Sequence, residues 1–171
     1  QFQLDVYGEV LDSVHIWRKK HRMTDGMWDL CRRLAEDDCD RWRSPDQGVW
    51  EMRGPARHFV FSKVMAWVAL DRAIHIADDL GLDGRVGRWR EERDAIRAEV
   101  LEKGWSEEAG AFVQHYGSDR MDASNLVLPL VRFLPADDHR VTATVERIVE
   151  ELAHPSGLLY RYRGEDHLQG D

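Results

Sequence analysis

The sequence predicts an all-α protein, arranged as about half of a double-walled α/α barrel. Apolar residues recur with a helical period along most of the 171 residues, and signals for strands are few. Three times, a helix that is apolar on most sides is followed by one with a single apolar face. Two concentric layers of helices require this alternation, because an inner ring is packed on both sides whereas an outer ring faces water. From pattern alone, the alternatives are an irregular helical bundle and an α-solenoid.

The first predicted pair of helices covers residues 5–20 and 27–43. The earlier helix has a broad apolar stripe, formed by Val6, Tyr7, Val10, Leu11, Val14 and Trp17. The later helix is amphipathic, and its apolar face is formed by Trp28, Cys31, Leu34, Ala35 and Trp42. We therefore expect the earlier helix in the inner ring and the later helix in the outer ring.

The second predicted pair covers residues 59–80 and 86–103. The segment 59–80 is the most hydrophobic of the chain and stops at Gly81, so we expect a helix that is buried on most sides. The segment 86–103 is rich in Arg and Glu. It keeps few apolar residues for packing, namely Trp89, Ile96, Val100 and Leu101.

The third predicted pair covers residues 123–133 and 138–153, after a small hairpin within residues 104–116. The segment 123–133 is almost wholly apolar, with Asp122 or Ser124 as the candidate N-cap and Pro135 near its end. The segment 138–153 is a one-sided amphipathic helix. Its predicted stripe consists of Val141, Val145, Ile148, Val149 and Leu152.

In such a barrel, the loops that enter the inner helices emerge at one end. These loops are residues 1–5, 44–58, 114–122 and 158–171. The second loop contains Trp50 and Glu51, and a carboxylic acid packed beside an indole is one way in which proteins keep an acid protonated near neutral pH. This pair therefore indicates general acid catalysis on a sugar linkage. The chain has seven Trp, most of which we expect in the core, although Trp also stacks on sugars.

Composition excludes several classes of function. The net charge is −8, from 24 basic and 32 acidic side chains, and no basic block is present, which argues against a nucleic-acid partner. No apolar run reaches the roughly 18 residues of a membrane span.

Cys31 and Cys39 are predicted about 12 Å apart on one helix, too far for a disulfide, and unpaired thiols favour a cytoplasmic protein. Clusters such as Asp37 to Asp40 lack metal-site spacing, so we expect neither metal nor cofactor. No feature indicates an oligomeric state.

Four blocks of the sequence together resemble glycoside hydrolase family 15, the glucoamylase-like enzymes that include glucodextranases and bacterial and archaeal trehalases. Residues 48–53 read GVWEMR and residues 62–72 read SKVMAWVALDR, which is similar to the central signature of that family. Residues 2–12 (FQLDVYGEVLD), 122–130 (DASNLVLPL) and 158–162 (LLYRY) resemble further family blocks in matching order. The resemblance therefore covers nearly the whole chain.

The resemblance implies an (α/α)6 barrel and inverting hydrolysis of α-glucosidic bonds, in which Glu51 matches the general acid. The family's general base lies in a block that follows the segment matching residues 158–162, and Glu165 and Asp166 do not match it. An Arg-Asp pair near the start of the family's catalytic domain is also missing. We therefore expect residues 1–171 to be a fragment of one catalytic domain, inactive by itself.

The resemblance also implies which residues contact the substrate, an α-glucoside oligosaccharide or trehalose. Trp50 forms a wall of the sugar site, unless it is a core residue that anchors its loop. Arg53 orients Glu51 or contacts sugar, unless it is a plain ion-pair partner. Arg161 grips the sugar with its forked donors, with Arg163 as the alternative if the alignment slips by two residues.

Asp5 and Asp122 enter predicted inner helices at the same end of the barrel, where each is either a sugar contact or an N-cap. Met52 follows the acid at a position where starch-acting members often carry a second acidic residue. This difference argues against starch-type subsites and is typical of the bacterial branch, in which trehalose is a candidate substrate, so the choice among α-glucosides stays open. The competing hypothesis is a helical scaffold that binds carbohydrate or protein without catalysis.

Overall fold

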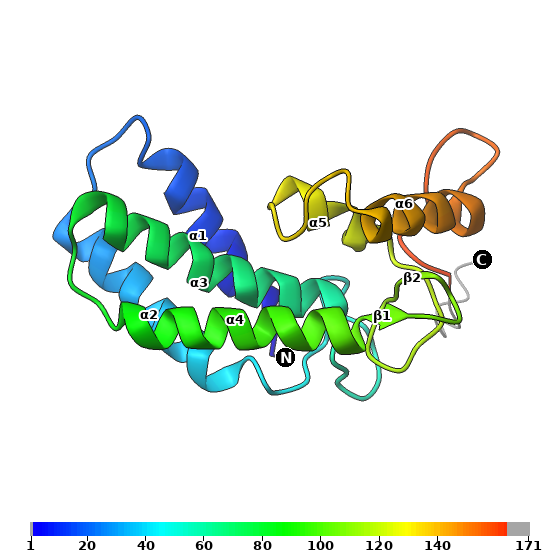
Figure 1. Ribbon diagram of the computed structural model, residues 1–171, viewed down its shortest axis with the longest axis horizontal. Helices are drawn as coiled ribbons and strands as arrows, with labels where there is room; N and C mark the ends of the chain where they lie inside the picture. Colours follow the sequence, from blue (N-terminus) through cyan, green and yellow to red (C-terminus); the bar gives the residue numbers. More distant parts are fainter. Residues whose placement is uncertain (1, 164–171) are drawn as a thin grey trace.

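The computed structural model describes residues 2–163 and is mostly helical (Figure 1). Its elements are α1 (Asp5–Trp17), α2 (Asp25–Arg41), α3 (Val60–Leu80), α4 (Val86–Lys103), β1 (Trp105–Ser106), β2 (Ala111–Phe112), the 3₁₀ helix η1 (Ala123–Leu126), α5 (Val127–Leu130) and α6 (His139–Leu152). Helices α1 and α3 run in the same direction, and α2 and α4 return in the opposite direction. This is the connectivity that alternating inner and outer helices require.

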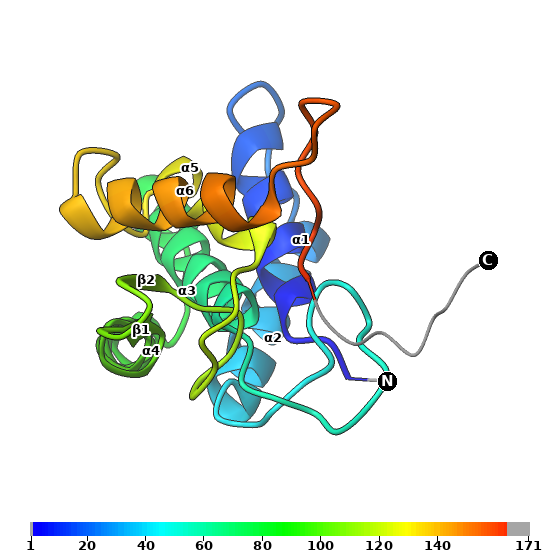
Figure 2. The ribbon, with the colours of Figure 1, turned by 90° about the vertical axis from the view of Figure 1, so that its right-hand side faces the viewer.

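Helix α3 lies at the centre of the helical layer, and every residue from Val60 to Ile74 is buried. Helices α1, α2 and α4 pack around it, as Figure 2 shows. The prediction of a helix buried on most sides is therefore confirmed. The contact with α1 is close, since a Cβ atom added at Gly8 would lie 2.2 Å from the backbone oxygen of Met65. Only glycine allows the two backbones to approach so closely.

Helices α2 and α4 each bury one face, as predicted for the outer layer. The buried residues of α2 include Trp28, Cys31 and Ala35, and those of α4 are Trp89, Ile96 and Val100. Both cysteines are buried and free. Helix α2 begins two residues earlier than predicted, because the side chain of Thr24 caps it by accepting a hydrogen bond from the Met27 N–H at 3.3 Å.

Helix α1 is less buried than predicted. Only Asp5, Gly8 and Leu11 are buried, whereas Val6 is 46% exposed and Ile16 is 57% exposed. Helix α1 packs mainly on α3 and makes a smaller contact with α2, and the remainder of its surface is exposed. The helix also ends at Trp17, three residues before the predicted end at Lys20.

The prediction of one continuous helix over residues 123–133 is wrong. The segment forms η1, then the single turn α5, and then turns in which Arg132 has a φ of +64°. Pro129 explains the interruption, since a proline inside a helix lacks the N–H donor and clashes with the preceding turn. Asp122 is the N-cap of η1, because its side chain accepts a hydrogen bond from the Ser124 N–H at 2.9 Å.

The predicted hairpin is confirmed by the antiparallel pairing of β1 with β2. Helix α6 packs on β2 and η1, with Asp138 as its N-cap. The predicted stripe of α6 is only partly correct, since Val145 is 37% exposed and Val149 is 50% exposed. Thr144 is buried instead, and its hydroxyl oxygen accepts a hydrogen bond from the Phe112 N–H at 3.0 Å.

Candidate active site

The loop that carries Trp50 and Glu51 is closed at its neck by a backbone pair. Asp46 and Arg57 exchange two N–H···O bonds of 2.9 Å each, and residues 47–56 project from this neck. The Gln47 N–H also donates to the Phe2 oxygen at 3.2 Å. The start of the chain and this loop, which we call the acid loop (residues 44–58), therefore lie against each other, as Figure 2 shows.

Glu51 occupies a tight turn within the acid loop. Its φ is +50°, in the left-handed region, which costs a non-glycine residue of order 1 kcal/mol or more. The Glu51 N–H donates to the Gly48 oxygen at 3.1 Å, and the Met52 N–H donates to the Gln47 oxygen at 2.9 Å. Gly48 has a φ of +68° and leaves room for the Phe59 ring, which a Cβ atom would approach to 2.9 Å. The turn directs the Glu51 side chain to an exposed position.

Trp50 is held at its edge by Asp122. The indole N–H donates to both carboxylate oxygens of Asp122, at 3.0 and 3.2 Å. Asp122 is 2% exposed and also accepts from the Gln114 amide at 3.2 Å and from the Ser124 N–H and hydroxyl at 2.9 and 2.7 Å. Its acceptor positions are thus occupied by protein donors, which favours the capping and positioning alternative over direct contact with a sugar.

Arg161 lies over the face of the same indole. The carbon at the centre of its guanidinium group is 5.3 Å from the centroid of the Trp50 ring, within the range of a cation–π contact. Backbone pairing brings this residue there, since the Ala123 N–H donates to the Arg161 oxygen at 2.9 Å and Asp122 forms a β-bridge with Tyr162. The structure therefore brings Trp50, Asp122 and Arg161 together from three predicted loops. Arg163, the alternative to Arg161, lies over the Tyr160 ring instead.

Asp5 is buried at the start of α1, and Leu4 rather than Asp5 is the N-cap residue of that helix. Asp5 is 5% exposed, and its Oδ1 atom has no hydrogen-bond partner among residues 2–163. Burial is the main reason that its pKa is raised to about 6, and the negative charges of Asp46, Glu9 and Glu51 raise it further. Of these charges, Glu51 contributes least to the raised pKa of Asp5.

Arg53 is exposed and forms no ion pair with Glu51 in the described part of the chain. It lines a cleft of about 420 Å³ between the acid loop and residues 114–120, together with Met52, His115 and Arg120. The ion-pair alternative for Arg53 is thus not observed. Glu51 is exposed as well, so its predicted shielding by Trp50 stays a prediction.

Sequence reasoning missed Gln114, which orients Asp122, and two buried residues below the acid loop, Asp46 and Lys63. Of these three residues, only Lys63 could have been noticed from the sequence, because it is a charged residue near the start of a very apolar segment. Glu165 and Asp166, which do not match the family's block with the general base, lie outside the described residues.

Two classes of site receive no support from residues 2–163. No group of three or more His, Cys, Asp or Glu side chains in this range is arranged to hold a metal ion. No helix in the same range combines the length and apolarity needed to cross a membrane.

The model of the family described as glycosyl hydrolases family 15 matches residues 1–167. The chain belongs to this family. The predicted resemblance is therefore confirmed. Among curated family members, the chain is 42% identical to a trehalase of Mycobacterium tuberculosis and 39% identical to a trehalase of Thermoplasma volcanium, over its full length in both cases. It spans 25% and 28% of these two proteins, about a quarter of their length.

Solved glycosidase structures share the fold of this family 15 chain. One glycosidase variant, in complex with glucose, superposes with a TM-score of 0.80 at 23% sequence identity, covering 94% of this chain and 43% of the other. The wild-type glycosidase superposes with a TM-score of 0.78 and similar coverage. The predicted fold class, part of an (α/α)6 double-layered helical barrel, is thus confirmed.

Proposed function

We propose that the complete protein containing this chain is an inverting glycosidase of α-glucosidic bonds, with trehalose as the preferred substrate. The observation that carries the proposal is the convergence at the acid loop: Glu51 follows Trp50, whose indole contacts Asp122 and Arg161. Two relatives at about 40% identity are named trehalases, which supports trehalose over longer α-glucosides. Met52, in place of a second acidic residue, supports the same choice.

In the proposed reaction, Glu51 is the general acid and donates its proton to the departing glycosidic oxygen. A second carboxylate, roughly 6.5 to 9.5 Å away, activates water on the opposite face of the sugar. We propose that this base belongs to a segment beyond the present residues. The 171 residues alone are then inactive, and detectable turnover of trehalose or maltose by the pure chain refutes this part of the proposal.

The remaining residues receive supporting roles. Trp50 forms a wall of the sugar site, Arg161 donates to sugar hydroxyls from beside that wall, and Arg53 contacts the substrate from the adjacent cleft. Asp5 contributes a buried carboxyl group to the sugar site. Asp122 acts through Trp50, because its acceptors are already used by protein donors. We also propose a reducing compartment such as the cytoplasm, supported by the two free cysteines.

The test uses the complete protein and its Glu51→Gln variant on trehalose, maltose and isomaltooligosaccharides, with the product anomer followed by NMR. On trehalose we expect equal amounts of β-glucose, from the sugar whose anomeric carbon is attacked, and α-glucose, from the departing sugar, which keeps its configuration. For the variant we expect a loss of about 10² to 10⁴ in kcat. Glu107→Gln, an exposed glutamate in the hairpin turn, is the matched control and should retain activity. Turnover that does not depend on Glu51 would refute its role as the general acid, and binding without any turnover by the complete protein would favour the non-catalytic scaffold.

A further inference from the structure

Lys63 is a fully buried cation, 0% exposed, in the first turn of α3. Its ammonium group donates to the backbone oxygens of Trp42 and Ser44, the latter at 2.8 Å. Trp42 is the C-cap residue of α2, and Ser44 begins the acid loop. The last carbonyl groups of a helix have no partner within that helix, so Lys63 supplies donors that the end of α2 otherwise lacks.

Asp46, which is 1% exposed, fixes the next part of the same segment. Its Oδ2 atom accepts from the Leu4 N–H at 3.1 Å and from the Ser62 hydroxyl at 2.8 Å. Ser62 directly precedes Lys63 on α3. Two adjacent residues of the central helix thus hold the stem of the acid loop, whose neck Asp46 closes with Arg57.

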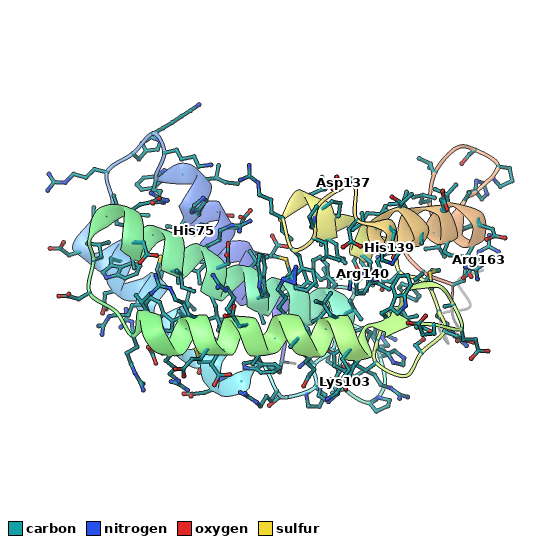
Figure 3. The ribbon with its side chains drawn as sticks, viewed as in Figure 1. His75, Lys103, Asp137, His139, Arg140 and Arg163 are labelled. Carbon is teal, nitrogen blue, oxygen red and sulfur yellow. The ribbon has the colours of Figure 1, made fainter. Side chains whose placement is uncertain are left out.

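The surroundings of Lys63 are rich in buried charge. Burial is the main cause that lowers the pKa of Lys63, to about 8, while the charges of Asp46, Glu99 and Asp38 raise it. Asp38 is 0% exposed, and neither of its carboxylate oxygens has a hydrogen-bond partner within residues 2–163. Lys103, at the end of α4 in Figure 3, lowers the Lys63 pKa. Placing an ammonium group there is costly, and the hydrogen bonds to Trp42 and Ser44 offset part of that cost.

We propose that Lys63 and Asp46 form a clamp that fixes the stem of the acid loop on α3 and thereby sets the position of Glu51 for proton transfer. Both are positioning residues, and the proposal rests on the proposed function of Glu51. The central helix is the most deeply buried element described, so it offers a rigid base for a loop that is otherwise largely exposed. A displacement of about 1 Å at a reacting group costs on the order of 10² in rate.

The test compares two substrates of the complete protein, trehalose and α-glucosyl fluoride. Both hydrolyses break the bond at the anomeric carbon and add water, but fluoride leaves as an anion and depends far less on a proton donor. We expect Lys63→Met to lower kcat on trehalose by about 10- to 100-fold and on the fluoride by less than about threefold. Lys103→Met, which removes an exposed ammonium group nearby, should leave both rates unchanged.

A purely structural role predicts a different pattern, in which both substrates lose activity equally, in proportion to the folded fraction measured by circular dichroism. Equal losses, or no loss on trehalose, therefore overturn the clamp. If Lys63→Met does not fold, Ser62→Ala provides the test, because it removes only the hydroxyl group that donates to Asp46. The ratio of trehalose to fluoride turnover must fall in that variant, and an unchanged ratio rejects the clamp.

The outcome also separates the clamp from the proposed function. If Glu51→Gln leaves trehalose turnover unchanged, the function assigned to Glu51 fails. If Glu51→Gln loses trehalose activity selectively while the Lys63 and Ser62 variants keep the wild-type ratio, only the clamp fails.

Discussion

Replacing Asp122 with alanine removes one acceptor from four donor groups at the point where three loops meet. The N-cap of η1 contributes about 1 kcal/mol. The Gln114 amide is 4% exposed and becomes an unsatisfied buried donor, at a cost of about 1 to 3 kcal/mol. The Trp50 N–H is only half-buried, so water replaces part of its lost bond. We therefore expect a loss of about 3 kcal/mol in the free energy of unfolding.

Urea unfolding of the 171-residue chain, followed by far-UV circular dichroism, measures this loss. The indole N–H resonance of Trp50, assigned through Trp50→Phe, should lose its protection from hydrogen exchange in the same variant. Asp122→Asn keeps one acceptor oxygen but turns an amide group toward the other donors. We therefore expect it to lose about half as much free energy of unfolding as Asp122→Ala. Asp119→Ala, an exposed aspartate of the same loop, should change stability by less than about 0.5 kcal/mol. The reasoning is refuted if Asp122→Ala costs no more than Asp119→Ala.

Two further variants test packing and charge. Gly8→Ala forces a methyl group against the Met65 backbone and should lower the free energy of unfolding by about 3 kcal/mol. Gly26→Ala, where the added methyl group meets no atom within 4 Å, should be neutral or stabilising. Equal melting temperatures for the two variants would contradict the close contact of α1 with α3. The raised pKa of Asp5, about 6 against 3.8 when unfolded, means that the native state binds this proton more tightly. Protonated Asp5 therefore stabilises the native state by about 3 kcal/mol below about pH 4, and this stabilisation is lost as the pH rises through 6. Asp5→Asn should remove that part of the pH dependence in urea titrations, and an unaltered slope would show that Asp5 is not the titrating group.

The sequence was sufficient to predict α3, because a long apolar run ending at a glycine has few other solutions. It failed over residues 123–133, where Pro129 breaks a segment whose apolar composition alone favours a helix. The burial of Val145 and Val149 was also mispredicted, because helical periodicity does not specify which flank of an apolar face meets a partner. That choice depends on β2 and η1, which pack on α6.

In the candidate site, too, the sequence predicted a local feature but not the long-range contacts. The resemblance in residues 48–53 located the Trp-Glu pair, but the partners of Trp50 lie 72 and 111 positions away in the sequence. No local pattern reports such contacts. Lys63 was hidden for a related reason, since a charged residue in an apolar segment has no predictable partner until the end of α2 is placed beside α3.

The central claim is that Glu51 donates the proton to the leaving group, and the dependence of Glu51→Gln on that leaving group tests it most directly. In the complete protein, turnover of trehalose by this variant should fall by about 10² to 10⁴, while turnover of α-glucosyl fluoride should stay close to the wild-type rate. Equal rates on trehalose for wild type and variant, or equal losses on both substrates, would contradict the assignment of Glu51 as the general acid.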